Sequence, residues 1–327
     1  MVKSSTFQRI GYIGSKYNIS EWIFDEISKR TDDTFTSFAD LFTGSCIMTH
    51  EALSRGYSCT SNDLEKYSHV IASGLRCPYT DVVDEIVKRL DSTEEGESGF
   101  VTKTYSPQGG RLFFTEENAM RIDRIRREIE NIKDDVGLDT YSFLLASLIT
   151  SADTVKNTSV VYGAYLKQFK KTALKRMVFA PIHKRQTSVK LETLNEDATK
   201  LKIQTDIAYV DPPYNSRQYG ANYFVLNQIL EPKEAKGVTG ISEYNKSSFC
   251  RKKEVKEAFE SMLTSVRARL FVISYSSESL LTKDEMMGVL SAHGTVEVVE
   301  KIHKRFKAQT MEANSDVVEY LFFVYGK

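Results

Sequence analysis

The sequence has few of the residues from which disulfide frameworks and metal sites are built. Its 327 residues include four cysteines, of which no two form a CxxC pair, and five histidines with no HxH or HxxxH spacing. A chain of this length can bury a full hydrophobic core without cross-links or a structural metal. We therefore expect reduced thiols and no bound metal ion.

Long apolar runs are absent as well. No stretch reaches the roughly 18 apolar residues that a membrane span needs. Residues 1–12 also lack the apolar centre of a signal peptide. We therefore expect a cytoplasmic protein that has no membrane partner.

The chain has no excess of charge, because 44 Lys and Arg residues balance 44 Asp and Glu residues. The overall charge therefore says nothing about nucleic acid. Between residues 151 and 190 the balance changes, since Asp153 is the only acid among nine basic residues. Such a segment is either a solvated face or a surface that contacts phosphates.

Hydrophobic periodicity predicts strands that alternate with helices in both terminal parts of the chain. Expected strands are residues 36–41, 57–61, 189–194, 207–210, 270–275, 295–302 and 317–324. Expected helices between them are 15–30, 46–54, 64–74, 219–230, 255–266 and 283–293. Seven strands with interleaved helices indicate an α/β fold with a doubly wound, mainly parallel sheet, in which the last two strands pair antiparallel.

The middle of the chain has a different pattern. Helical periodicity alone occurs there, at residues 81–90, 116–132 and 140–155, with no clear strand between. We therefore predict a catalytic domain formed by residues 1–75 and 186–327, interrupted by a mostly helical insertion at 76–185. Ligands of doubly wound sheets bind beyond the carboxyl ends of the strands.

The first motif, Asp40-Leu41-Phe42-Thr43-Gly44-Ser45-Cys46, lies at the end of the first expected strand and opens a helix. Gly44 allows a sharp turn and close approach to a ligand, and the helix amino terminus can receive an anionic group. Asp63 follows the second strand, where an acid can bind ribose hydroxyls. No GxGxxG sequence is present, so a dinucleotide phosphate loop is disfavoured. A plain strand-to-helix turn is the alternative.

The second motif is Asp211-Pro212-Pro213-Tyr214, directly after an apolar strand. Two prolines remove two amide donors and stiffen the chain, which fixes the carbonyl before Pro213. That carbonyl and the Asp211 carboxylate can accept hydrogen bonds from an exocyclic amine, and Tyr214 offers a ring for stacking. These acceptors would favour a nitrogen that gains positive charge as it attacks an alkyl group. A proline-rich turn with a buried tyrosine is the alternative.

These motifs resemble those of the Dam-like, alpha-group adenine-N6 DNA methyltransferases. The tetrad at 211–214, the turn at 40–46 and residues 11–16 are similar to motifs IV, I and X of that family. Further segments resemble the FokI-type modification methylases, so that the likeness covers nearly the whole chain: 105–107, 111–115, 117–119, 144–148, 162–167, 215–219 and 305–307. Along the chain, motif X comes first, followed by motif I, the insertion and motif IV, and this order is that of the alpha group.

The resemblance implies a Rossmann-like class I fold and S-adenosylmethionine as cofactor. Asp40 would take the methionine ammonium group, Asp63 the ribose and Asp197 the adenine of the cofactor. The implied cofactor contacts are Tyr12, Gly14, Ser15, Lys16, Asp40, Phe42, Thr43, Gly44, Ser45, Asp63, Leu64, Asp197 and Ala198. Cys46 departs from the family pattern, which has glycine there, and we expect it to be a packing residue.

The implied reaction is site-specific methylation of an adenine flipped out of duplex DNA into a pocket formed by Asp211, Pro212, Pro213 and Tyr214. The insertion would help to recognise the DNA. Candidate DNA contacts are Lys156, Asn157, Tyr162, Lys167, Lys170, Lys171, Arg217, Lys246, Arg305 and Lys307. For the residues near 151–162, a polar loop with core tyrosines is the alternative.

Other functions stay open at this point. An RNA adenine or cytosine-N4 methyltransferase would use the same chemistry on another substrate, and a non-catalytic nucleic-acid-binding partner could keep the same fold. A cytosine-ring methyltransferase is disfavoured because no Pro-Cys dipeptide is present. Double-stranded DNA is the expected partner. A cognate restriction endonuclease is a further candidate, and monomer and dimer are both compatible with the sequence.

Overall fold

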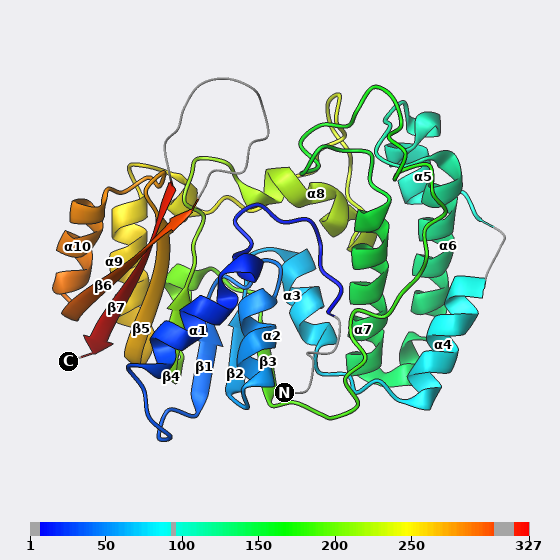
Figure 1. The fold of residues 1–327 in the computed structure, drawn as a ribbon. Helices are drawn as coiled ribbons and strands as arrows, with labels where there is room; N and C mark the ends of the chain where they lie inside the picture. Colours follow the sequence, from blue (N-terminus) through cyan, green and yellow to red (C-terminus); the bar gives the residue numbers. More distant parts are fainter. Residues whose placement is uncertain (1–6, 93–95, 304–316, 327) are drawn as a thin grey trace.

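A single mixed sheet organises the computed structural model, which describes residues 7–92, 96–303 and 317–326. Its strand order is β3-β2-β1-β4-β5-β7-β6 (Figure 1). The strands are β1 (Ser37–Asp40), β2 (Ser58–Asn62), β3 (Leu191–Leu194), β4 (Gln204–Val210), β5 (Arg267–Ser276), β6 (Gly294–His303) and β7 (Val317–Gly326). Only β7 runs antiparallel to its neighbours β5 and β6. The predicted seven-stranded, doubly wound α/β sheet of Rossmann-like type is confirmed.

The two central strands bring the two motifs to one edge of the sheet. β1 pairs in parallel with β4, and Asp40 lies opposite Tyr209 in the register. Both strands are buried because apolar residues such as Phe38, Ile207 and Val210 face the layers above and below. The chain that leaves β1 and the chain that leaves β4 therefore emerge side by side.

Helices cover both faces of the sheet (Figure 1). One hydrophobic cluster gathers residues of α1 (Ser20–Ser28), α2 (Ile47–Ser54), α3 (Lys66–Gly74) and α8 (Tyr219–Leu230). A second cluster on the opposite face gathers residues of α9 (Val255–Ser265) and α10 (Lys283–Ser291). These helices lie within a few residues of the bounds that periodicity predicted.

The insertion contains α4 (Asp81–Ser92), α5 (Phe100–Tyr105), α6 (Glu116–Asn131) and α7 (Lys133–Thr154). Sequence analysis missed α5, which has six residues and is too short for a periodic signal. Residues of α6 and α7, among them Ile125 and Leu148, belong to the same hydrophobic cluster as α3. The insertion therefore shares a core with the sheet domain, and its boundaries at 76 and 185 stay a prediction.

Close packing of α3 on α7 depends on Gly74. A Cβ atom added there would lie 2.9 Å from Cβ of Ala146 and 3.2 Å from Cα of Phe143. We expect Gly74→Ala to lower the free energy of unfolding by about 1–3 kcal/mol because the helices must separate. Gly288 on α10 is the matched control, since a Cβ there meets no atom within 4 Å. Gly288→Ala should stabilise by about 0.5–1 kcal/mol. Urea denaturation measures both, and equal effects would contradict the packing argument.

Several features are not found in the part of the chain that the structure describes. All four cysteines are free and buried. Over residues 7–92, 96–303 and 317–326, no group of His, Cys, Asp and Glu side chains is arranged to hold a metal ion. Within the same ranges, no helix combines the length and the apolar character that a bilayer crossing requires.

Candidate functional site

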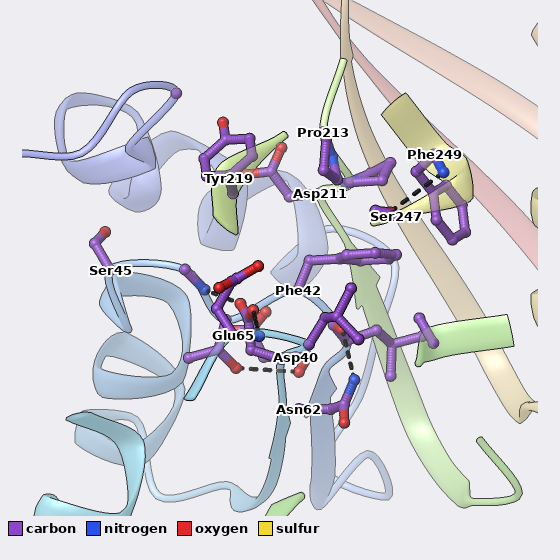
Figure 2. A pocket seen from close by; sticks show the side chains of 18 of the residues that line it. Asp40, Phe42, Ser45, Asn62, Glu65, Asp211, Pro213, Tyr219, Ser247 and Phe249 are labelled. Carbon is purple, nitrogen blue, oxygen red and sulfur yellow. Dashed lines mark hydrogen bonds between the residues drawn. The ribbon is translucent and has the colours of Figure 1, made fainter. Parts of the chain in front are cut away.

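A cavity of about 860 Å³, a figure that includes its open mouth, lies at the carboxyl edge of the strands. In Figure 2, Asp211, Pro213 and Tyr219 lie at one end, Asp40, Asn62 and Glu65 lie at the other, and Phe42 lies between. All the residues predicted as cofactor contacts, together with the tetrad at 211–214, line this single cavity. Their individual roles toward ligands stay predictions.

The turn after β1 is shaped by backbone hydrogen bonds. The Thr43 amide donates to the carbonyl of Asn62 at 3.0 Å, and the Gly44 amide donates to Asp63 Oδ2 at 2.7 Å. Gly44 has φ 51°, and a Cβ there would lie 2.7 Å from the ring of Tyr12. Glycine is therefore required for both the conformation and the close approach.

Cys46 is the one non-glycine residue of the described ranges with a positive φ, 67°. It is fully buried and precedes α2, so it packs as expected. A left-handed conformation is unfavourable for residues with a Cβ. The position thus has a geometry for which glycine is suited, and the cysteine adopts it with some backbone strain.

Asp40 lines the cavity and has a buried acceptor atom without a partner. Its Oδ2 accepts a hydrogen bond from Thr49 Oγ1 at 2.8 Å, whereas its buried Oδ1 has no partner. Burial raises the pKa of this carboxyl to about 7. A buried acceptor without a partner is destabilising, and a ligand cation would satisfy it. The site therefore fits a bound ammonium group, such as that of the methionine part of S-adenosylmethionine.

Two further acids lie at the end of β2. Asp63 Oδ1 accepts from the amide of Glu65 at 2.8 Å, and burial raises the pKa of Asp63 to about 6. Glu65 Oε2 accepts from Asn227 Nδ2 at 2.9 Å, and burial raises its pKa to about 7. Glu65 was not among the predicted site residues, because it lies at the start of an expected helix and nothing in the sequence indicates that its side chain lines the cavity.

The Asp211 carboxylate of the tetrad at 211–214 forms an ion pair with Lys16. Lys16 Nζ lies 3.0 Å from Asp211 Oδ1 and 3.1 Å from Glu319 Oε1. Burial raises the pKa of Asp211 to about 6, Lys16 lowers it and Glu319 raises it. Burial lowers the pKa of Lys16, but the two carboxylates outweigh it and raise that pKa. Lys16 is thus engaged with acids, which the sequence did not predict.

Tyrosines form one wall of the cavity and fix the segment at 11–16. The ring of Tyr12 stacks on that of Tyr223 at a centroid distance of 5.0 Å and contacts Tyr219 at 5.1 Å. Tyr219 Oη donates to the carbonyl of Ile13 at 3.0 Å, and the Ile13 amide donates to Tyr223 Oη at 2.8 Å. The segment that carries Lys16 is therefore held in place by α8.

Three of the predicted DNA contacts have buried side chains with partners inside the protein, which favours the alternative of a polar loop with core tyrosines. Lys156 Nζ and Tyr162 Oη both bind Asp153 Oδ1, at 2.7 and 3.0 Å. Asn157 Nδ2 donates to the carbonyls of Leu112 and Leu166. All three side chains are buried, so they cannot reach DNA in this conformation. Their residue types suggested a contact surface, but residue type does not reveal burial.

The other predicted DNA contacts differ in exposure. Lys167, Lys171, Arg217 and Lys246 are exposed. Lys170 is half-buried and donates to the carbonyl of Thr158 at 2.6 Å, which leaves it less free to bind a phosphate. Arg305 and Lys307 lie outside the described residues.

Known proteins resemble this chain over almost its whole length. Residues 12–289 match the family described as D12 class N6 adenine-specific DNA methyltransferase. The chain is 68% identical to the type II methyltransferase M.CviAII of Paramecium bursaria Chlorella virus 1, covering 97% of this chain and 98% of that protein. It is 36% identical to M.NlaIII of Neisseria lactamica (95% and 98% covered). It is 34% identical to M.FokI of Planomicrobium okeanokoites (96% and 52% covered).

Proposed function

The chain belongs to the family of D12 class N6 adenine-specific DNA methyltransferases, and from this premise we propose how its cavity serves the reaction. The enzyme methylates adenine in DNA at N6 and uses S-adenosylmethionine as methyl donor. In our proposal the two ends of the cavity bind different ligands. The end at Asp40 and Asp63 holds the cofactor, and the end at Asp211 receives the target base.

The cofactor end is supported by the unsatisfied acceptor of Asp40. Asp40 Oδ1 would accept from the ammonium group, as its missing partner suggests. Asp63 and Glu65 would accept from the ribose hydroxyls, and Asp197 and Ala198, which line the same cavity, would hold the adenine of the cofactor. When bound, S-adenosylmethionine supplies the methyl group of a sulfonium ion.

The base end is supported by Asp211, the observation that carries the proposal. Its carboxylate lies in the same cavity as Asp40 and is mostly buried, with 18% of the side chain exposed. An exocyclic amine is a poor nucleophile, and an acceptor beside it stabilises the positive charge that develops as it attacks. Tyr214 would stack on the base. An adenine in a duplex cannot reach this depth unless it is flipped out.

A direct assay distinguishes this proposal from its alternatives. Duplex DNA and structured RNA are incubated with the protein and methyl-labelled S-adenosylmethionine, and the product nucleosides are identified by mass spectrometry. We expect N6-methyladenine from the duplex and little label in RNA. N4-methylcytosine, or preferential labelling of RNA, would favour the other substrates. Binding of the duplex without any methylation would favour the non-catalytic partner.

Exposed lysines after α7 are proposed to contact phosphates. Lys167 and Lys171 neutralise phosphates in this proposal, so each contact removed should reduce the slope of log affinity against log salt by about 0.9. Lys167→Ala with Lys171→Ala should therefore flatten the plot by about 2 units in a gel-shift titration. Lys256→Ala, an exposed lysine on α9, is the control and should leave the slope unchanged. An unaltered slope in the double variant would show that these lysines belong to a solvated face that does not contact phosphates.

We further propose that the enzyme protects DNA alongside a restriction endonuclease of the same specificity, since its relatives are type II methyltransferases. It would then work inside the cell, on the chromosome or on viral DNA. Sequencing of modified adenine in DNA from cells that express the protein identifies the recognition site. That site then tells which endonuclease the modification blocks.

A further inference from the structure

Glu319 reaches the base end of the cavity from a distant part of the chain. β7 is antiparallel to β5, and its register places Glu319 opposite Ser276 at the carboxyl end of β5. An antiparallel strand thus brings its beginning to the edge where the parallel strands end. Glu319 lies there with 10% of its side chain exposed.

The Lys16 ammonium group lies between two carboxylates. It is 3.0 Å from Asp211 Oδ1 and 3.1 Å from Glu319 Oε1, and 8% of its side chain is exposed. Ser274 Oγ donates to the same Glu319 Oε1 at 2.5 Å. Ser274 is fully buried on β5, so Glu319 is fixed by both a charge and a hydroxyl group.

The charges of this group bear directly on methyl transfer. Lys16 alone would neutralise Asp211, and its positive charge would oppose a second positive charge on a nitrogen bound nearby. With Glu319 the three side chains carry two negative charges and one positive charge, a net charge of minus one. Such a preorganised negative group attracts a cation that forms in the reaction.

We propose that Glu319 is a positioning residue for methyl transfer: it holds Lys16 against Asp211 Oδ1 and cancels its charge, so that Asp211 keeps its attraction for the target nitrogen. This inference rests on the proposed function, because it assumes that Asp211 faces the target amine. Glu319 itself touches only Lys16 and Ser274 among the hydrogen-bond and ion-pair partners described.

A purely structural role would make Glu319 a counter-ion for a buried lysine and nothing more. The pH dependence of the rate separates the two roles. Ionisable groups that face Asp211 from the surrounding elements are Lys16, Asp40, Tyr209, Tyr214, Tyr219 and Glu319. Burial raises the pKa of all three tyrosines, which stay neutral. At saturating cofactor, Asp40 would be paired with the ammonium group.

The substitution Glu319→Gln keeps the shape of the side chain and removes its negative charge. We expect its single-turnover methylation rate at pH 8 to fall about tenfold or more, with S-adenosylmethionine affinity and duplex affinity within twofold of wild type. Loss of the negative neighbour lowers the pKa of Asp211, so the acid limb of the pH profile should move to lower pH. Lys16→Gln removes the positive neighbour and should move that limb to higher pH.

Glu319→Asp is the second variant, because it keeps the charge on a shorter side chain. It should keep the wild-type midpoint and a faster rate than Glu319→Gln. The proposal is overturned if Glu319→Gln has the wild-type rate, if its midpoint does not move, or if the Asp and Gln variants behave alike. Failure of the proposed function is seen separately, since wild type would then yield no N6-methyladenine from duplex DNA.

Discussion

Replacing Asp211 with alanine is expected to slow single-turnover methylation at least roughly a hundredfold, the usual effect of removing a preorganised group that stabilises charge in a transition state. The carboxylate is mostly buried, and the effect should be large because little water can replace it. Asp211→Asn retains a neutral acceptor and should lose less. Rapid-quench kinetics with saturating cofactor measures both rates.

Binding should survive in the Asp211→Ala variant. Phosphate contacts elsewhere dominate DNA affinity, and the cofactor end of the cavity is untouched. Gel-shift affinity and calorimetric S-adenosylmethionine affinity are the controls, together with thermal unfolding, since Lys16 loses one of its two partners. A variant that binds both ligands and methylates at the normal rate would remove Asp211 from the mechanism.

The wild-type rate should also depend on pH in a defined direction. Burial raises the pKa of Asp211 to about 6, while Lys16 lowers it and Glu319 raises it. Protonated Asp211 lacks the negative charge that stabilises positive charge on the target nitrogen, so the rate is expected to fall as pH drops through about 6 and to level off above it.

Asp40→Asn is expected to weaken S-adenosylmethionine binding about 10- to 100-fold. A charge-assisted hydrogen bond to the ammonium group would be lost, which corresponds to roughly 1.5–3 kcal/mol. The free protein should unfold at the same temperature or higher, because the variant removes a buried carboxylate whose Oδ1 has no partner. Isothermal titration calorimetry measures the affinity, and Asp33→Asn on the exposed turn before β1 is the matched control.

Binding of S-adenosylmethionine should also depend on pH through the protonation of Asp40. Burial raises the pKa of Asp40 to about 7, so the free protein holds a neutral carboxyl below that pH and a carboxylate above it. Affinity for the cofactor should therefore rise between pH 6 and pH 8 in wild type, and this rise should be smaller in Asp40→Asn. An unchanged affinity in the variant would place the ammonium group elsewhere.

The sequence predicted the sheet and its edge well, for a physical reason. Apolar strands such as residues 207–210 are buried on both faces and are easily recognised, and the residues that follow parallel strands meet at one edge. Asp40 ends β1, while Asp63 and Asp211 directly follow β2 and β4, so their meeting in one cavity could be expected.

Contacts between side chains that are distant along the chain could not be predicted from the sequence. Glu319 lies in a mostly apolar strand, and nothing in that pattern indicates an ion pair with Lys16. The burial of Asn157 and Tyr162 was also not evident, because polar groups that suit DNA equally suit buried hydrogen bonds. Burial depends on how α7 packs, which local residue types do not encode.

The most direct test of the two-ended cavity is a crystal structure of the protein with duplex DNA and a cofactor analogue that lacks the transferable methyl group. The account predicts a flipped adenine with N6 within hydrogen-bonding distance of the Asp211 carboxylate, and the ammonium group of the analogue on Asp40 Oδ1. An adenine that stays stacked in the duplex, or an analogue bound away from Asp40, would contradict it.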